Sequence, residues 1–143
     1  MRLSSLADYA VVMMGAAARH CGGRRTSAAE LAAETGIPAP TAQKLVSLLT
    51  RAGLLKAVRG AGGGIKLARP SAAISLAEII EAVEGPIAMT ACVEAGRHDC
   101  GLEGSCQVRP HWGALNEAVR GALGNVSLAS LANAPVAAME AHA

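Results

Sequence analysis

Two short helical patterns joined by a tight turn occupy residues 27–53 of this 143-residue chain. Ser27, with a glutamate three residues later, forms a capping box at the start of the first pattern, and Gly36 ends it after barely two turns. The second pattern begins at Pro40, which suits a first helical turn, and Gly53 is expected just beyond its end. This arrangement is typical of a helix-turn-helix, although an ordinary helical hairpin gives the same local pattern.

The next segment, LLKAVRGAGGGIKLA, predicts a strand, a glycine-rich turn and a second strand. Arg59 stands at the turn, and Lys56 and Lys66 flank it. Such a hairpin can act as a wing that approaches the DNA backbone or a minor groove. A phosphate-binding loop is the alternative for GAGGG, but that loop would lead into a helix, whereas this one leads into a strand. The wing therefore favours the helix-turn-helix over the helical hairpin.

A long amphipathic helix is expected after Pro110, ending at Gly124. It carries an apolar stripe of Leu115, Val119 and Leu123. Little chain remains to cover this stripe, so we interpret the helix as a dimerisation element. Further helices are expected over residues 5–20 and after a second capping box that starts at Ser75.

These elements predict a mainly α fold: a winged helix-turn-helix DNA-binding domain with a two-stranded wing and a long C-terminal dimerisation helix. We divide the chain into a DNA-binding domain at residues 1–84 and a cysteine-containing loop at 85–109. A dimerisation helix with a terminal turn follows at 110–132, and a disordered tail at 133–143.

The charge distribution agrees with a nucleic-acid partner. Residues 1–70 contain ten Lys or Arg and three Asp or Glu, whereas residues 71–143 contain three and eight. A basic half favours double-stranded DNA as the partner. The chain lacks a secretory signal pattern and any stretch long enough to span a membrane, so we expect a cytoplasmic protein without membrane contact. We find no nucleophile motif and no small-molecule substrate site, which argues against an enzyme.

Three cysteines lie close together in CVEAGRHDCGLEGSC, namely Cys92, Cys100 and Cys106. A reducing cytoplasm disfavours disulfides, and structural zinc prefers more closely spaced cysteine pairs. Iron–sulfur clusters prefer thiolates, and the glycines between the cysteines would allow the loop to bend around one centre. We expect Cys21, near the end of the first helix, to be a structural thiol rather than a ligand.

The chain resembles the winged-helix iron–sulfur regulators of bacteria, the family of IscR and NsrR. The resemblance rests on the opening MRLSSLADYAV, the helix end AGLL, the wing VRGAGGGIKLA, the segment ISLAEIIEAVEGPI and the three cysteines after it. The pairing of LADYAVV with EGPIAMTAC, together with the segment VRPHW, most resembles the regulators of the SUF cluster-assembly operon. The resemblance implies a homodimeric transcription regulator whose DNA affinity depends on a bound cluster.

By position, the resemblance implies that Gln43 is a base-reading residue, with Thr41 and Lys44 beside it and Arg59 in the wing. A glutamine can pair bidentately with adenine. Lys44 and Lys56 are expected to contact phosphates, although solvated charge is the simpler alternative. The expected DNA-binding residues are Thr41, Gln43, Lys44, Arg51, Lys56 and Arg59.

The fourth cluster ligand differs from part of the family. IscR-type members carry a histidine three residues after the last cysteine, whereas this chain has Arg109. Asp8 matches the acidic residue that NsrR-type members contribute across the dimer, and we favour it over His111 and then His98. The cluster type, [2Fe-2S] or [4Fe-4S], stays open. So do two alternative functions: a nitric-oxide or redox-sensing regulator of the same fold, and a zinc-stabilised interaction module.

Overall fold

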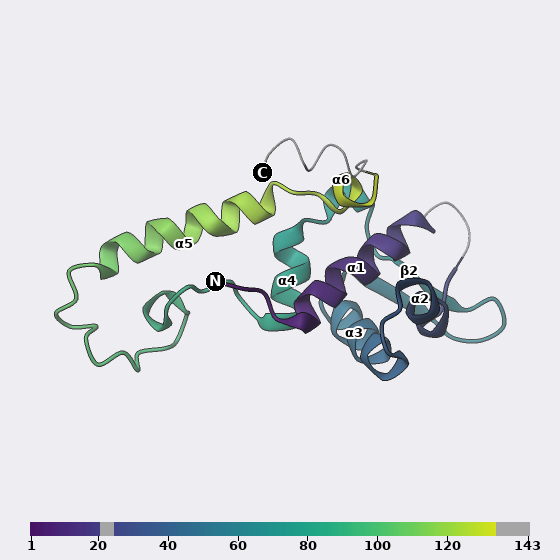
Figure 1. Ribbon diagram of the computed structural model, residues 1–143, viewed down its shortest axis with the longest axis horizontal. Coiled ribbons are helices and arrows are strands. Elements are labelled where there is room, and N and C mark those ends of the chain that lie inside the picture. Colours follow the sequence, from purple (N-terminus) through teal and green to yellow (C-terminus); the bar gives the residue numbers. More distant parts are fainter. Residues whose placement is uncertain (21–24, 134–143) are drawn as a thin grey trace.

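The computed structural model describes residues 1–20 and 25–133 (Figure 1). The described chain is mainly helical with one two-stranded antiparallel sheet, which confirms the predicted fold class. Its α-helices are α1 (Ser5–Arg19), α2 (Ala28–Thr35), α3 (Ala39–Arg51), α4 (Leu76–Glu84), α5 (Arg109–Gly124) and α6 (Leu128–Asn133). The strands are β1 (Leu55–Val58) and β2 (Gly64–Leu67), and two short 3₁₀ turns are η1 (Ser71–Ala73) and η2 (Ala91–Val93).

Local capping signals set the helix ends. Both predicted capping boxes form: Ser27 and Ser75 each accept from the backbone N–H three residues on, and the glutamate there accepts from the serine N–H in return. Gly36 and Gly53 both have a φ of 78°, a left-handed conformation that glycine adopts without a Cβ penalty. The turn between α2 and α3 is therefore encoded within a few residues of itself.

The wing is the antiparallel pair of β1 and β2, in which Lys56 lies opposite Lys66. Its turn requires glycine at Gly63, where an added Cβ would lie 2.3 Å from the carbonyl oxygen of Val58. Thr26, just before α2, makes an isolated bridge to Ile65 of β2. The wing follows the helix-turn-helix in the chain, and this bridge also connects β2 of the wing to the segment just before α2.

The core lies between α1, α2, α3 and α4, under the base of the wing. Its largest fully buried side chains are aliphatic, namely Met13, Met14, Leu31, Leu45, Leu49, Leu54, Leu55, Ile74, Ile79, Ile80 and Leu128. Leu128 belongs to α6, which follows the long helix and returns to pack on α1. Backbone hydrogen bonds from Leu128 N–H to Ile74 C=O, and from Leu76 N–H to Val126 C=O, hold this return in place. The sequence suggested only a terminal turn at this position.

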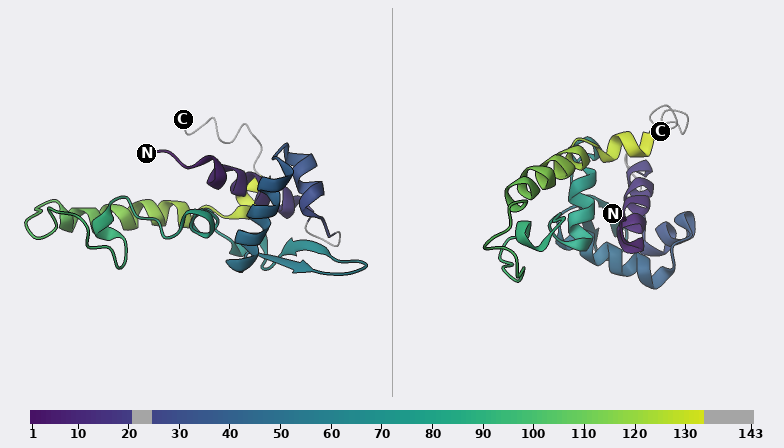
Figure 2. Two further views of the ribbon diagram at one scale, coloured as in Figure 1. Left: turned by 90° about the horizontal axis from the view of Figure 1, so that it is seen from below. Right: turned by 60° about the vertical axis from the view of Figure 1, so that its left-hand side comes forward.

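We call residues 85–124 the arm, and the rest of the described chain the winged-helix half. Figures 1 and 2 show the arm extending away from the winged-helix half, with α5 along one side and the cysteine loop at its outer end. The wing projects from the opposite end of the molecule (Figure 2). Among the described residues of α5, only Asn116 is buried. Cys21 and residues 134–143 of the expected tail lie outside the described residues.

Candidate functional site

Helix α3 presents the predicted recognition surface. Gln43 and Lys44 are exposed in its first turns and Thr41 is half-buried, while Ala42 and Leu45 are buried in the core. The helical period therefore directs the two polar side chains to solvent on the face opposite the core.

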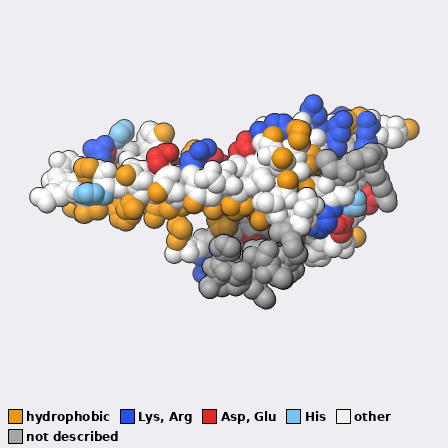
Figure 3. Space-filling model, turned by 90° about the horizontal axis from the view of Figure 1, so that it is seen from above, with side chains coloured by type: hydrophobic (Ala, Val, Ile, Leu, Met, Phe, Trp, Pro, Cys, Tyr) orange, Lys and Arg blue, Asp and Glu red, His pale blue; other side chains and the backbone are white. Residues whose placement is uncertain are grey.

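The basic side chains expected at DNA are free of ion pairs within residues 1–20 and 25–133. Arg51 at the end of α3, Lys56 on β1 and Arg59 in the wing turn are all exposed. The arginines of the winged-helix half that form ion pairs there are Arg19, with Glu34, and Arg69, with Glu78. Figure 3 shows Lys and Arg side chains gathered along one edge of the winged-helix half. A surface of uncompensated cations of this kind suits a phosphate backbone.

The pairing of Lys56 with Lys66 across the wing disfavours folding, since like charges directly opposite each other repel. A polyanion bound at the wing would relieve this repulsion. Of these two residues, only Lys56 was predicted as a DNA contact.

Arg25 is a residue that the sequence reasoning missed. Its guanidinium donates a hydrogen bond to the carbonyl oxygen of Gly62 at the wing tip. Thr26 and Ile65 exchange two backbone hydrogen bonds, of 3.2 and 2.6 Å. These contacts hold the wing against the segment that leads into α2. No local pattern reveals them, because Arg25 and Gly62 are 37 residues apart.

The three loop cysteines are free thiols and all are half-buried. Cys92 belongs to η2, and its Sγ lies 3.1 Å from the hydroxyl of Thr90. Of the loop glycines proposed to bend the chain, only Gly96 has a positive φ, of 81°. Within the described residues, no group of three or more His, Cys, Asp or Glu side chains converges as a metal site. The thiols are thus available on one loop but are not preassembled around a centre.

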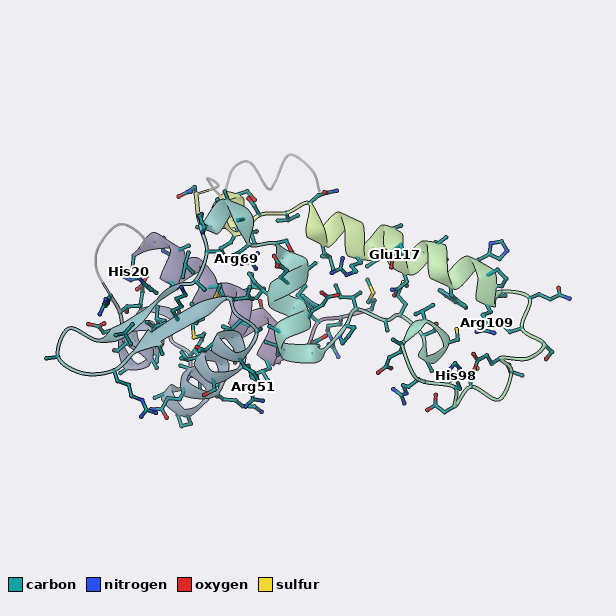
Figure 4. The ribbon with its side chains drawn as sticks, turned by 180° about the vertical axis from the view of Figure 1, so that it is seen from behind. His20, Arg51, Arg69, His98, Arg109 and Glu117 are labelled. Carbon is teal, nitrogen blue, oxygen red and sulfur yellow. The ribbon has the colours of Figure 1, made fainter. Side chains whose placement is uncertain are left out.

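Ion pairs organise the loop. Arg97 contacts Glu94 at 2.9 Å and Asp99 at 3.1 Å. Glu103 contacts Arg109 at 2.9 Å and His98 at 3.2 Å. Figure 4 shows His98 and Arg109 at the outer end of the arm, far from Arg51 of the recognition helix.

The three candidates for a fourth ligand have different surroundings. Asp8 is exposed in the first turn of α1, in the winged-helix half. His111 is exposed in the first turn of α5, and His98 is exposed and paired with Glu103. None of them joins the cysteines in a metal-binding group within the described part of this one chain.

Two hollows adjoin the arm. A pocket of about 600 Å³ beside Cys92 is lined by residues from η2 and α5, among them Arg109, Asn116 and Glu117. A groove of about 710 Å³ lies between the N-terminal residues, the end of α4 and the side chains of Val119 and Leu123. None of the described helices is both long and apolar enough to cross a membrane.

Comparison with known proteins identifies the family. The model of the Rrf2 family, described as an iron-dependent transcriptional regulator, matches residues 3–134. The chain belongs to the Rrf2 family of transcriptional regulators. IscR of Yersinia pseudotuberculosis is 33% identical over 133 residues, which cover 93% of this chain and 80% of that protein. Protein aau3 of Rhizobium meliloti is 38% identical over 123 residues, 86% of this chain and 75% of that protein.

Solved structures agree with this assignment. CymR of B. subtilis, the global cysteine regulator, superimposes with a TM-score of 0.73 at 30% identity, covering 94% of this chain and 98% of that one. IscR of T. potens superimposes with a TM-score of 0.68 at 27% identity, covering 92% and 85%. This Rrf2 protein is thus a DNA-binding regulator of the IscR-like type, and its relatives are regulators rather than enzymes.

Proposed function

We propose that this Rrf2 protein is a cytoplasmic, homodimeric transcription regulator whose promoter affinity is controlled by an iron–sulfur cluster. The observation that carries the proposal is the pairing of two surfaces in one chain. An unpaired basic recognition helix and wing lie at one end, and three free thiols share a single loop at the other. The similarity to IscR supports the link between them.

Cys92, Cys100 and Cys106 would hold the cluster. Soft thiolate donors suit iron and sulfide, and the half-buried setting of all three limits access of water. A bound cluster supplies a centre that can be lost, oxidised or damaged, and so reports on iron and oxidants. The thiols would have to draw together on binding, because within the described residues they do not converge as a metal-binding group.

The fourth ligand is proposed to be the partner subunit's Asp8. Asp8 is exposed and lies on α1 rather than on the arm. A carboxylate there would connect the cluster on one subunit to the DNA-binding half of the other. His111, at the start of α5, is the alternative.

Dimerisation is proposed to use the apolar stripe of α5. Leu115 is 49% exposed, and Val119 and Leu123 are half-buried. Figure 3 shows hydrophobic side chains along one edge of the arm. A second copy of the stripe would cover this surface, as in paired amphipathic helices.

We further propose that the target genes are those of SUF cluster assembly, on the resemblance of EGPIAMTAC and VRPHW to that branch. A redox-sensing regulator is a second candidate. It is favoured by the structural likeness to CymR, one structure of which is an oxidised form, and by the three unpaired thiols. In that case the thiols would respond to oxidants without a cluster.

The test is anaerobic purification followed by absorption and Mössbauer spectra, and by mobility shifts of cluster-loaded and cluster-free protein on the gene's own upstream region. The proposal predicts a coloured protein whose DNA affinity changes on cluster loss, and Mössbauer spectra assign the cluster type. Cys106→Ser should abolish the colour, whereas its neighbour Ser105→Ala should not. A colourless protein with stoichiometric zinc and no salt-dependent duplex binding would support a zinc-stabilised module instead.

Three further variants test the remaining roles. Asp8→Ala should alter the cluster spectrum, whereas Ser5→Ala, at an exposed position near the start of the same helix, should leave it unchanged. Lys44→Ala should weaken binding to all sequences alike and lower the salt slope by about 1, while Gln43→Ala should cost about 1–3 kcal/mol at its own base pair.

A further inference from the structure

The backbone just before Cys92 is held by side chains from two helices. Asn116 of α5 donates from Nδ2 to the carbonyl oxygen of Ile87, at 2.9 Å. Its Oδ1 accepts from the N–H of Met89, also at 2.9 Å. A single amide thus binds the chain at two points, three and five residues before the first cysteine.

Asn116 is unusual on its helix. It is 6% exposed, the one buried position among the described residues of α5. Removing its amide would leave a donor on Met89 and an acceptor on Ile87 without partners in a partly buried setting, which is costly. This burial sets the side chain apart from the exposed polar residues around it.

A second contact fixes the same segment from α4. Glu81 Oε1 accepts from the N–H of Ile87 at 3.3 Å. Arg120 donates hydrogen bonds to both carboxylate oxygens of Glu81, from Nε to Oε1 at 2.9 Å and from Nη2 to Oε2 at 3.1 Å. Asn116 and Arg120 are four residues apart, so they lie on one face of α5. Both backbone polar groups of Ile87 are therefore taken by side chains.

Cys92 lies at the end of this fixed segment. It lines the same pocket as Asn116, and its Sγ is close to the hydroxyl of Thr90. Cys100 and Cys106 lie further along the loop, beyond Gly96, and line neither of the two hollows described.

We propose that Asn116, together with the Glu81–Arg120 pair, is a positioning clamp that fixes Cys92 against α5 and α4 while the other two cysteines stay adjustable. The role of the clamp in cluster binding rests on the proposed function, whereas the contacts that form the clamp do not. In that role Cys92 is the anchored ligand, through which changes at the cluster reach α4 and hence the DNA-binding half.

The test compares Asn116→Leu, which keeps the branching at Cγ but removes the amide, with Asn125→Ala, an exposed asparagine at the end of the same helix. Three measurements are made: hydrogen exchange of residues 85–90 in cluster-free protein, the alkylation rates of Cys92 and Cys100 in the same protein, and cluster release to a chelator. Asn116→Ala, which removes the same donor and acceptor and leaves a smaller side chain, is made in parallel in case Asn116→Leu fails to fold.

The clamp predicts exchange of the Met89 amide faster by about tenfold, the effect of losing one hydrogen bond of ordinary strength. Alkylation of Cys92 should accelerate similarly, with Cys100 unchanged, and cluster release should be faster. Unchanged exchange, or equal acceleration at both cysteines, would overturn the clamp. Faster exchange with unaltered Cys92 alkylation and cluster release would overturn the positioning role. If the wild-type protein takes up no cluster, the proposed function is wrong. The exchange and alkylation rates of the cluster-free protein then still show whether Asn116 fixes the segment before Cys92.

Discussion

The winged-helix half and the arm of this Rrf2 protein are held together by different kinds of contact. The winged-helix half has a continuous aliphatic core between α1, α2, α3 and α4 and uses local caps at its helix ends. The arm has a long helix with a single buried residue, and a loop that is held by ion pairs and hydrogen bonds rather than by an apolar core. The first region is stable by its own packing, whereas the second leaves apolar surface and thiols for partners. The cluster-dependent regulation that we propose would need this contrast, because the arm would have to change on cluster binding or loss while the DNA-binding half keeps its shape.

The largest expected effect is on the stability of the winged-helix half. Leu45→Ala removes a fully buried side chain from the core face of the recognition helix. It should lower the free energy of unfolding by about 2–5 kcal/mol, through lost burial and the cavity left behind. Urea unfolding followed by circular dichroism measures it, and Ser47→Ala, exposed on the same helix, is the control. A loss below about 0.5 kcal/mol would mean that this region has no tightly packed core.

The next change tests whether the arm depends on a partner. Leu115→Asp puts a charge on the exposed apolar stripe of α5. It should weaken dimerisation by about 2–3 kcal/mol, the scale of burying one leucine, while leaving the fold of the winged-helix half intact. Sedimentation equilibrium measures the dimer, and Ala114→Asp, an exposed position beside the stripe, carries the same charge. If both variants stay dimeric, the stripe is not the interface.

Features that depend on a few neighbouring residues could be predicted from the sequence. The serine–glutamate pairs at Ser27 and Ser75, and the glycines at Gly36 and Gly53, each determine a helix end within four residues, and all appear as predicted. The helical period also placed Gln43 on the exposed face of α3.

Contacts between residues far apart in the chain could not be predicted in this way. The contacts of Arg25 with the wing tip, of Asn116 with the segment before Cys92, and of α6 with α1 span about 30 to 120 residues and leave no periodic signal. The arrangement of the cysteines is a different case. Their spacing favours a cluster, but in the proposed site the ligand geometry would depend on a metal and a second subunit, neither of which the order of residues encodes.

A smaller effect compares glycines in the two regions. An added Cβ at Gly63 in the wing turn would meet backbone oxygens of Val58 and Gly60 at 2.3 and 2.7 Å, whereas at Gly101 in the arm it would meet nothing within 4 Å. Gly63→Ala should therefore distort the wing and weaken DNA binding by about 1–3 kcal/mol, with little change in unfolding of the helices. Gly101→Ala should leave both unchanged. Fluorescence anisotropy with a labelled operator measures the DNA affinity of each variant. If Gly63→Ala and Gly101→Ala bind the operator equally well, the wing does not contact DNA.

The smallest effect concerns the ion pair that joins the two regions. The hydrogen bonds from Arg120 hold the pKa of Glu81 below its usual value of 4.5, against the opposing effect of partial burial. Because the native pKa is depressed, the pair stabilises the fold fully above about pH 4.5, and this stabilisation is lost as the pH falls through the lower native value. Glu81→Gln should thus be less stable than the wild type at pH 7, and the gap should narrow as the pH falls below 4.5. The side chain of Arg120 is nearly half exposed, so the gap is small and should shrink further in high salt. Urea midpoints of the two proteins at several pH values measure it. A gap that stays constant down to pH 3 would mean that the charge of Glu81 contributes nothing to stability.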